Sequence, residues 1–178
     1  MGSLSIKGDN QSLTKNNPQL SQLKVKFGWD AAELEMDKSV FLLDANGKVR
    51  VDEDFIFYNN PIHESGSVEY DEDSGDINVD FPKIPAGVMK IDFTLTIYDE
   101  EESGQNFSQI TGAYISIIDA QNNKEILRFD LQENFSVETA VVVGEIYRNN
   151  DEWEFNAVAE GFTGGLEKLC ENFGVTLQ

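Results

Sequence analysis

The sequence predicts a mainly β protein, a two-layer β-sandwich with a short C-terminal helix. Three observations support this fold class: short runs rich in β-branched and aromatic residues recur, turn-forming residues separate them about every 8 to 12 residues, and helical spacing is clear only near the end of the chain. The chain has no Pro/Gly/Ser-rich linker and no internal repeat. Residues 1–178 are therefore expected to form a single domain.

The strands can be justified in chain order. Residues 23–29 alternate apolar and polar side chains, as a half-buried strand does. Residues 39–43 are an almost unbroken apolar run, which predicts a strand buried on both faces, and Asn46-Gly47 then supplies the positive φ angles of a tight turn. Further strands are predicted at residues 55–58, 67–70, 77–81, 90–98, 113–119, 124–130, 140–148 and 152–159.

The two ends of the chain differ in character. Residues 1–20 are polar and are expected to be only loosely held. Residues 166–173 have helical spacing, and Gly174 follows as a helix stop.

Acidic residues outnumber basic ones, with 33 Asp and Glu against 13 Lys and Arg and a formal net charge of -20. Nucleic acid is therefore not expected as a partner, because phosphates need a basic face, and an anionic membrane surface is disfavoured for the same reason. No window approaches the ~18 apolar residues of a membrane span. Because no signal-like apolar run opens the chain and only one cysteine is present, a reducing cytoplasm is the expected location.

The residues available for catalysis are few. Cys170 is the only cysteine and is predicted to be a small buried apolar residue. His63 is the only histidine, so at most one imidazole could act as a base, and its place beside Pro61 predicts a surface loop. Sequence adjacency to Ser65 says nothing about triad geometry. We therefore expect that the protein is not an enzyme.

An acidic stretch without Lys or Arg covers residues 51–82 and is densest at residues 71–76, on a loop between two predicted strands. Two carboxylates about 4 Å apart repel by ~1 kcal/mol in bulk water and by ~4 kcal/mol at an effective dielectric of about 20. If the fold gathers several of them, a hard cation such as Ca²⁺, which takes 6 to 8 oxygen ligands, is the natural compensation. A solvated acidic loop is the alternative, since the helix-loop-helix calcium pattern would need Gly at Asp76 and Glu at Pro82.

Ordered phrases run along nearly the whole chain. They include FGWD at residues 27–30, DFIFYNN at residues 54–60, GEIYR at residues 144–148 and GFTGGL at residues 161–166. In these phrases the chain resembles the TerD family of tellurium-resistance and stress-response proteins. The resemblance implies a non-enzymatic β-sandwich that binds Ca²⁺ through acidic loops at one end.

The resemblance also implies a set of ligands. Residues 34–39 match the family motif Phe-Asp-Leu-Asp-Ala-Ser, with Glu35 in place of the usual Asp, Asp37 retained and Lys38 in place of a small residue. The loop after Tyr70 is shorter than is usual in the family. The expected Ca²⁺ ligands are Glu35, Asp37, Asn59, Asn60, Asp71, Asp73 and Asp76, whose carboxylate and amide oxygens suit this ion. Their three segments are predicted to meet at one end of the sandwich.

Other functions stay open beside the calcium-binding module. A calcium-independent scaffold that recruits a basic partner fits the charge, and the resemblance implies protein partners of a stress-response complex or cyclic-nucleotide-like ligands for some members. A hydrolytic enzyme is a distant third. A negative surface repels an oxyanion and one cysteine offers little reducing capacity, so signalling or assembly is expected rather than direct tellurite chemistry.

Overall fold

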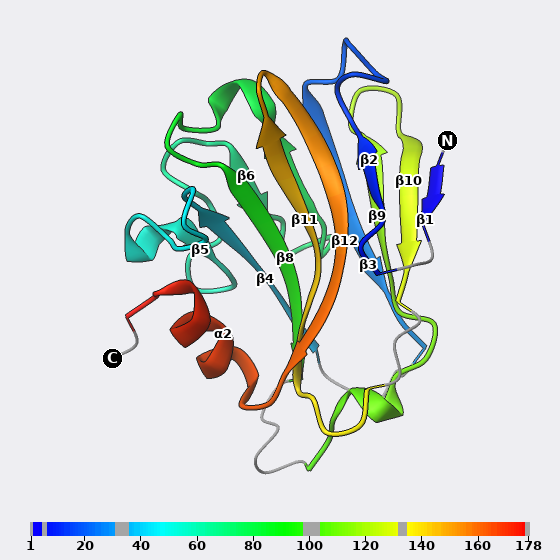
Figure 1. Cartoon of the computed structure of the whole chain (residues 1–178), viewed down its shortest axis with the longest axis vertical. Helices are drawn as coiled ribbons and strands as arrows, with labels where there is room; N and C mark the ends of the chain where they lie inside the picture. The colour runs from blue at the N-terminus through cyan, green and yellow to red at the C-terminus, as the bar shows by residue number, and fades with distance from the viewer. Residues whose placement is uncertain (1, 5–6, 31–35, 98–103, 132–134, 177–178) are drawn as a thin grey trace.

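The computed structural model describes residues 2–4, 7–30, 36–97, 104–131 and 135–176. Two sheets are stacked face to face, and a short helix near the C-terminus lies on the outside of one of them (Figure 1). This arrangement confirms the predicted β-sandwich. Within the described ranges, no helix is long and apolar enough to span a membrane.

Sheet I has the strand order β1–β10–β9–β3–β7–β6 and is antiparallel except where β1 runs parallel to β10. Its strands are β1 (Gly2–Leu4), β10 (Lys124–Asp130), β9 (Tyr114–Asp119), β3 (Gln22–Gly28), β7 (Ile77–Asp80) and β6 (Val68–Tyr70). The β6–β7 hairpin at one edge carries the acidic loop of residues 71–76.

Sheet II has the strand order β2–β12–β11–β8–β4–β5 and is antiparallel throughout its described strands. Its strands are β2 (Asn10–Ser12), β12 (Glu152–Phe162), β11 (Ala140–Asn149), β8 (Lys90–Ile97), β4 (Met36–Leu43) and β5 (Phe55–Ile56). Helix α2 (Gly165–Phe173) covers part of the outer face of this sheet (Figure 1). Three short 3-10 turns complete the described elements: η1 (Asp52–Asp54), η2 (Phe81–Lys83) and η3 (Phe107–Gln109).

The main core lies between the two sheets. Because alternate residues of a strand point to opposite faces, Ile91, Phe93 and Leu95 of β8 enter this core together, and each is fully buried. On the facing sheet, Val25 and Ile77 are buried in the same cluster. The alternation predicted from the sequence for a half-buried strand is thus the pattern that fills the sandwich.

Strand β4 is buried on both faces, as its apolar run predicts. Val40 and Leu42 belong to the main core, whereas Phe41 and Leu43 belong to a second apolar cluster beneath α2. The ring centroid of Phe41 lies 4.6 Å from that of Phe173 in the helix. The helix therefore explains why this strand lacks the polar outer face of its neighbour β8.

The N-terminal segment is tied into both sheets. Strand β1 pairs with β10 and strand β2 pairs with β12, so the expectation that residues 1–20 are loosely held is wrong for the described residues. Leu13 is fully buried, and its N–H donates to the carbonyl of Trp153 at 2.9 Å. The physical reason is that each sheet has an edge with unpaired backbone groups, which a short polar strand can satisfy without apolar side chains.

Candidate cation-binding pole

The loop of residues 71–76 is a compact turn closed by its own backbone. Asp71 N–H donates to the Asp76 carbonyl at 2.9 Å, and Gly75 N–H donates to the Asp71 carbonyl at 2.7 Å. One carboxylate oxygen of Asp71 accepts the N–H of Asp73 at 3.0 Å, as in other Asx turns. Gly75 has a φ of 78°, which favours glycine. The carboxylate of Asp71 therefore helps to hold the conformation of the loop.

Lys38 reaches this loop from the opposite sheet. Its Nζ donates to the carbonyl oxygen of Gly75 at 2.6 Å and lies 5.7 Å from the ring centroid of Trp29. Burial lowers the pKa of the Lys38 ammonium, and the charge of Asp76 opposes that decrease. The contact joins β4 of sheet II to the β6–β7 hairpin of sheet I.

The carboxylates around this contact come from both sheets. Asp76, at the end of the β6–β7 loop, is only 6% exposed. Burial raises the pKa of the Tyr70 hydroxyl, and the charges of Asp37 and Glu72 raise it further. The carboxylates at the start of β4 and on the β6–β7 loop are therefore close enough to act on the same side chain. We call Asp37, Lys38 and residues 71–76 the acidic pole.

The predicted ligands are distributed unequally around this pole. Asp37 lies on the face of β4 opposite to Lys38, because successive residues of a strand alternate. Asn59 is exposed, and the side-chain amide nitrogen of Asn60 donates to the carbonyls of Glu53 and Phe55 at 3.3 and 2.9 Å. Glu35 lies outside the described residues.

The donors at the pole have the chemistry that Ca²⁺ takes, but they do not form a closed shell in this conformation. Among the described residues, no group of three or more Asp, Glu, His or Cys side chains is placed to hold a metal ion. The Gly75 carbonyl is contacted by an ammonium instead. The predicted ligands Asp71, Asp73 and Asp76 are thus neighbours on one loop, with Asp37 nearby and a lysine among them.

The comparison of residues 34–39 with the family motif puts the Lys38 cation beside the expected ligands but assigns it no contact. The alternation within β4 could have indicated its direction, since Val40 and Leu42 on the same strand face are core residues. A lysine two positions before such a pair points toward the space between the sheets. Which oxygen it meets there depends on how the two sheets are stacked.

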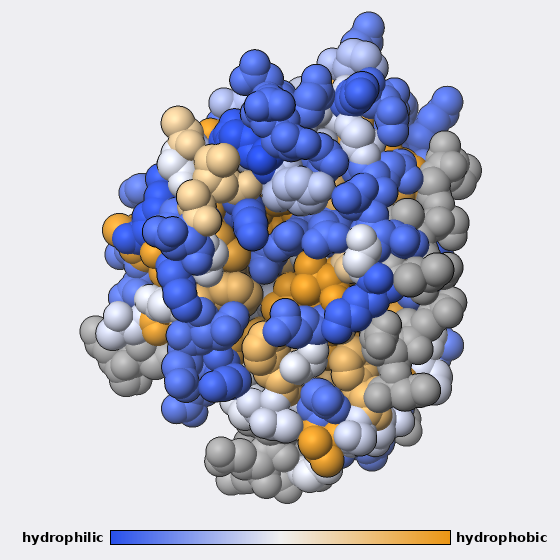
Figure 2. All heavy atoms as spheres, in the orientation of Figure 1, coloured by the Kyte–Doolittle hydropathy of each residue, from blue (hydrophilic) through white to orange (hydrophobic). Residues whose placement is uncertain are grey.

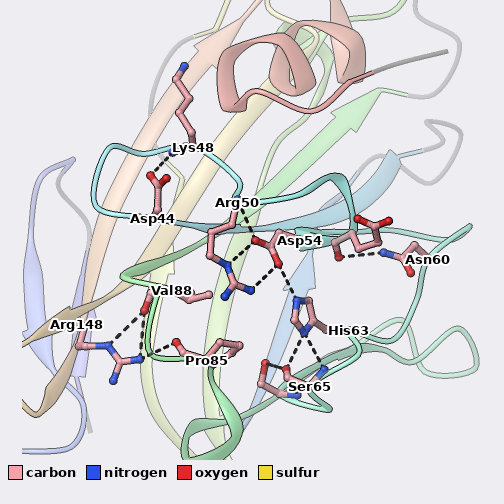
Figure 3. Close-up of polar contacts among 12 residues, drawn as sticks. Asp44, Lys48, Arg50, Asp54, Asn60, His63, Ser65, Pro85, Val88 and Arg148 are labelled. Atoms are coloured by element: carbon pink, nitrogen blue, oxygen red, sulfur yellow. Dashed lines mark hydrogen bonds and ion pairs between the residues drawn. The ribbon is translucent and has the colours of Figure 1, made fainter.

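A second polar network surrounds Asp54, whose side chain is fully buried (Figure 3). Arg50 Nε and Nη2 each donate to its carboxylate at 2.9 Å, and His63 Nε2 lies 2.8 Å from Oδ1. Burial acts to raise the pKa of Asp54, but the hydrogen bonds from Arg50 and His63 outweigh it and the pKa is lowered. Asp54 is therefore an ionised group held inside the protein.

His63 is 2% exposed, so the prediction of a surface histidine is wrong. The buried carboxylate of Asp54 supplies the reason, because it draws the imidazole inward. The backbone N–H of Ser65 points at His63 Nδ1 at 3.1 Å, and Ser65 Oγ lies 2.7 Å from the same nitrogen. Since a backbone N–H can only donate, Nδ1 is an acceptor and Nε2–H donates to Asp54.

Asp54, His63 and Ser65 have the composition of a hydrolytic triad but are arranged as an anchor. Ser65 Oγ accepts the N–H of Ser67 at 3.1 Å and lies 2.7 Å from Ser67 Oγ. Asp54, His63 and Ser65 each accept a hydrogen bond from a nearby backbone N–H. The network thereby ties η1 to the turn that precedes β6.

A shallow groove of about 230 Å³ lies on the outer side of the acidic loop. It is lined by Pro61, Ile62, Glu69, Tyr70, Asp71, Glu72 and Asp73. Ile62 is 57% exposed and contributes apolar area to this groove. The groove thus combines an apolar wall with carboxylates.

Comparison with known proteins identifies the family. The family model of the TerD domain matches residues 1–173. The chain belongs to the TerD family. The tellurium resistance protein TerD of Serratia marcescens is 42% identical over 183 residues and covers 95% of each chain. General stress protein 16U of Bacillus subtilis is 41% identical over 184 residues, again covering 95% of each chain.

The fold of this TerD-family chain also has a solved counterpart. The crystal structure of a homologue of telluride resistance protein from Streptomyces coelicolor matches with a TM-score of 0.63 at 15% identity, over 84% of this chain and 95% of that chain. The likeness supports the β-sandwich. The resemblance to the TerD family is confirmed, and these two relatives are named for tellurium resistance and general stress.

Proposed function

We propose that this TerD-family chain is a non-enzymatic binding module of the bacterial stress response that works in the cytoplasm and takes up Ca²⁺ at its acidic pole. The observation that carries the proposal is the gathering of charge at one end of the sandwich. The charges of Asp37 at the start of β4 and of Glu72 on the β6–β7 loop both raise the pKa of the Tyr70 hydroxyl, and the buried Asp76 ends the same loop. A divalent cation would relieve that field.

The proposed Ca²⁺ ligands are oxygen atoms of carboxylate and amide side chains at or near the acidic pole. Asp73 is exposed on the loop, and Asp76 is buried at its end. Asn60 has its amide nitrogen engaged, so its carbonyl oxygen is the atom it can offer. With these we group Asp37 and Asp71, and also Glu35 and Asn59 on the strength of the family resemblance.

A non-enzymatic role is favoured by the state of the candidate catalytic groups. Ser65 is the one hydroxyl beside the imidazole of His63 among the described contacts, and its oxygen is held by Ser67. The turn carrying these residues uses them to support its own backbone. Nucleophilic catalysis needs a hydroxyl that can approach a substrate carbonyl, with donors placed for the developing oxyanion.

A calcium-independent scaffold is the second candidate, and the groove beside the loop favours it. Ile62 offers apolar area while Glu69, Glu72 and Asp73 surround it with negative charge. Such a surface is complementary to a basic protein segment that carries an apolar side chain. The two candidates differ in whether partner binding survives a chelator.

The proposal is tested by thermal unfolding of the whole chain in Ca²⁺ and in chelator. A ligand that binds only the folded state stabilises it by RT ln(1 + [L]/Kd), or about 2.7 kcal/mol at a hundredfold excess over Kd. Asp73→Asn is expected to reduce the calcium-dependent rise in Tm. Asp151→Asn is the matched control. Asp151 lies in the turn between β11 and β12, next to Lys90, and Lys90 pairs with the last residue of β4 whereas the acidic pole lies at its start. Equal Tm values in millimolar Ca²⁺ and in chelator would contradict calcium binding.

A further inference from the structure

Lys38 occupies an unusual place for a lysine. It belongs to a strand face whose next members, Val40 and Leu42, are fully buried core residues. Its side chain therefore points between the sheets at the end of the sandwich, where the residue is half-buried. Lysine is rarely buried without a partner, because removing its ammonium from water is costly.

The partner is the acidic loop. Lys38 Nζ donates to the Gly75 carbonyl at 2.6 Å, and the same peptide group carries the Asp76 N–H, which donates to Ser74 Oγ at 3.1 Å. That peptide is thus held from both sides. The ammonium also lies within the field of the buried Asp76 carboxylate.

We infer that Lys38 is the resident cation of the acidic pole, holding the β6–β7 loop in place and competing with Ca²⁺ for its oxygens. The Gly75 carbonyl and the Asp76 carboxylate are hard oxygen donors of the kind that Ca²⁺ takes. Either cation can satisfy these oxygens, but the two positive charges repel each other when both are present. The calcium part of this inference rests on the proposed function, whereas the loop-holding part does not.

This role explains two features together. The carboxylates of the described pole do not converge on a common point, as they would around a bound divalent ion. The loop is nevertheless compact, and the ammonium of Lys38 supplies a positive charge among its carboxylates. Lys38 carries a single positive charge, so the pole stays negative overall and can still attract a second cation.

The decisive variant is Lys38→Met, which keeps the length and apolar stem of the side chain and removes its charge. Lys26→Met is the matched control. Lys26 is an exposed residue of β3, close enough for its charge to lower the pKa of Lys38. Both variants remove one positive charge from the neighbourhood, and only Lys38→Met removes the hydrogen bond to Gly75.

The first measurement is amide hydrogen exchange by NMR in chelator. Lys38→Met is expected to speed the exchange of the Gly75 and Asp76 amides by at least about tenfold, while Lys26→Met leaves them within about threefold of the original chain. Unchanged exchange in Lys38→Met would overturn the loop-holding role, whatever the calcium result.

The second measurement is calorimetric titration of the three full-length proteins with CaCl₂. Lys38→Met is expected to bind Ca²⁺ at least about tenfold more tightly than the original chain, a difference of about 1.4 kcal/mol, and Lys26→Met to stay within about threefold. Binding by Lys38→Met alone would support the inference and contradict the proposed function. Equal affinity in the original chain and Lys38→Met would overturn the competition and leave the proposed function standing. If none of the three binds Ca²⁺, the proposed function and the competition both fail, and the exchange experiment decides the loop-holding role.

Discussion

Asp92 on β8 lies directly opposite Glu145 on β11, so two carboxyl groups meet on the outer face of sheet II. A register shift between Val142 and Gly144 precedes this pair. Asp92 is 5% exposed, and its Oδ1 is buried without a hydrogen-bond partner among the described residues. Burial raises the pKa of Asp92 well above its usual value, and the charge and hydrogen bond of Glu145 raise it further.

The face of the molecule shown in Figure 2 is hydrophilic over much of its area, with hydrophobic residues grouped near its centre. Like charges on directly opposed residues destabilise a sheet, and the raised pKa of Asp92 favours the protonated form of this carboxyl. Protonated Asp92 can donate to Glu145, which two ionised carboxylates cannot do.

Asp92→Asn is expected to stabilise the protein, and more so at alkaline pH. Because the folded-state pKa of Asp92 is raised, its contribution to stability is complete below the unfolded pKa and is lost as pH rises through the folded pKa. The side-chain amide of the asparagine can donate a hydrogen bond to Glu145 at any pH, because it does not need to take up a proton first. The gain in unfolding free energy should therefore reach about 1–3 kcal/mol at alkaline pH. Urea unfolding at mildly acidic and at alkaline pH measures it. A variant less stable than the original chain at alkaline pH would contradict a raised pKa of Asp92.

Asp54→Asn is expected to destabilise the protein by at least about 2 kcal/mol at neutral pH, because it leaves Arg50 and His63 without their shared carboxylate. The folded-state pKa of Asp54 is lowered, so its contribution is present above the unfolded pKa and is lost as pH falls through the folded pKa. The difference in unfolding free energy between variant and original should therefore shrink in acid. A difference that stays constant with pH would refute the ionised anchor.

Cys170 is expected to resist alkylation in the folded protein. Burial raises the pKa of its thiol to about 12, and the charges of Asp52 and Glu167 act in the same direction. The thiolate is the reactive form, so iodoacetamide should label Cys170 only after unfolding. Mass spectrometry of native and urea-treated samples gives the readout. Rapid labelling of the native chain would reopen direct thiol chemistry toward tellurite.

Most strand positions could be predicted because alternation and turn residues are local properties. The predicted strand at residues 124–130 has the bounds of β10, and the strand predicted at residues 90–98 begins with β8 and matches it to Ile97, residue 98 lying outside the described residues. The helix predicted at residues 166–173 differs from α2 by one residue. Strands β1 and β2 were missed, because a strand of three residues is too short to show alternation and it is defined by the neighbour with which it pairs.

The polar sites depended far more on the three-dimensional arrangement. The sequence places Asp71, Asp73 and Asp76 on one loop, since residues so close in the chain must be neighbours. It could not place His63 against Asp54, because nothing local distinguishes a buried turn from an exposed one. It could not place Asp92 opposite Glu145, because a one-residue shift in register would have turned one of them to the other face.

By itself, the amino-acid sequence determined the family, the β-rich class and the excess of negative charge, all of which are written in residue types and their order. The stacking of the sheets decided that a lysine of β4 meets a carbonyl of the β6–β7 loop. That contact joins residues 37 positions apart and belonging to different sheets, so it exists only once both sheets have formed and packed on their shared core.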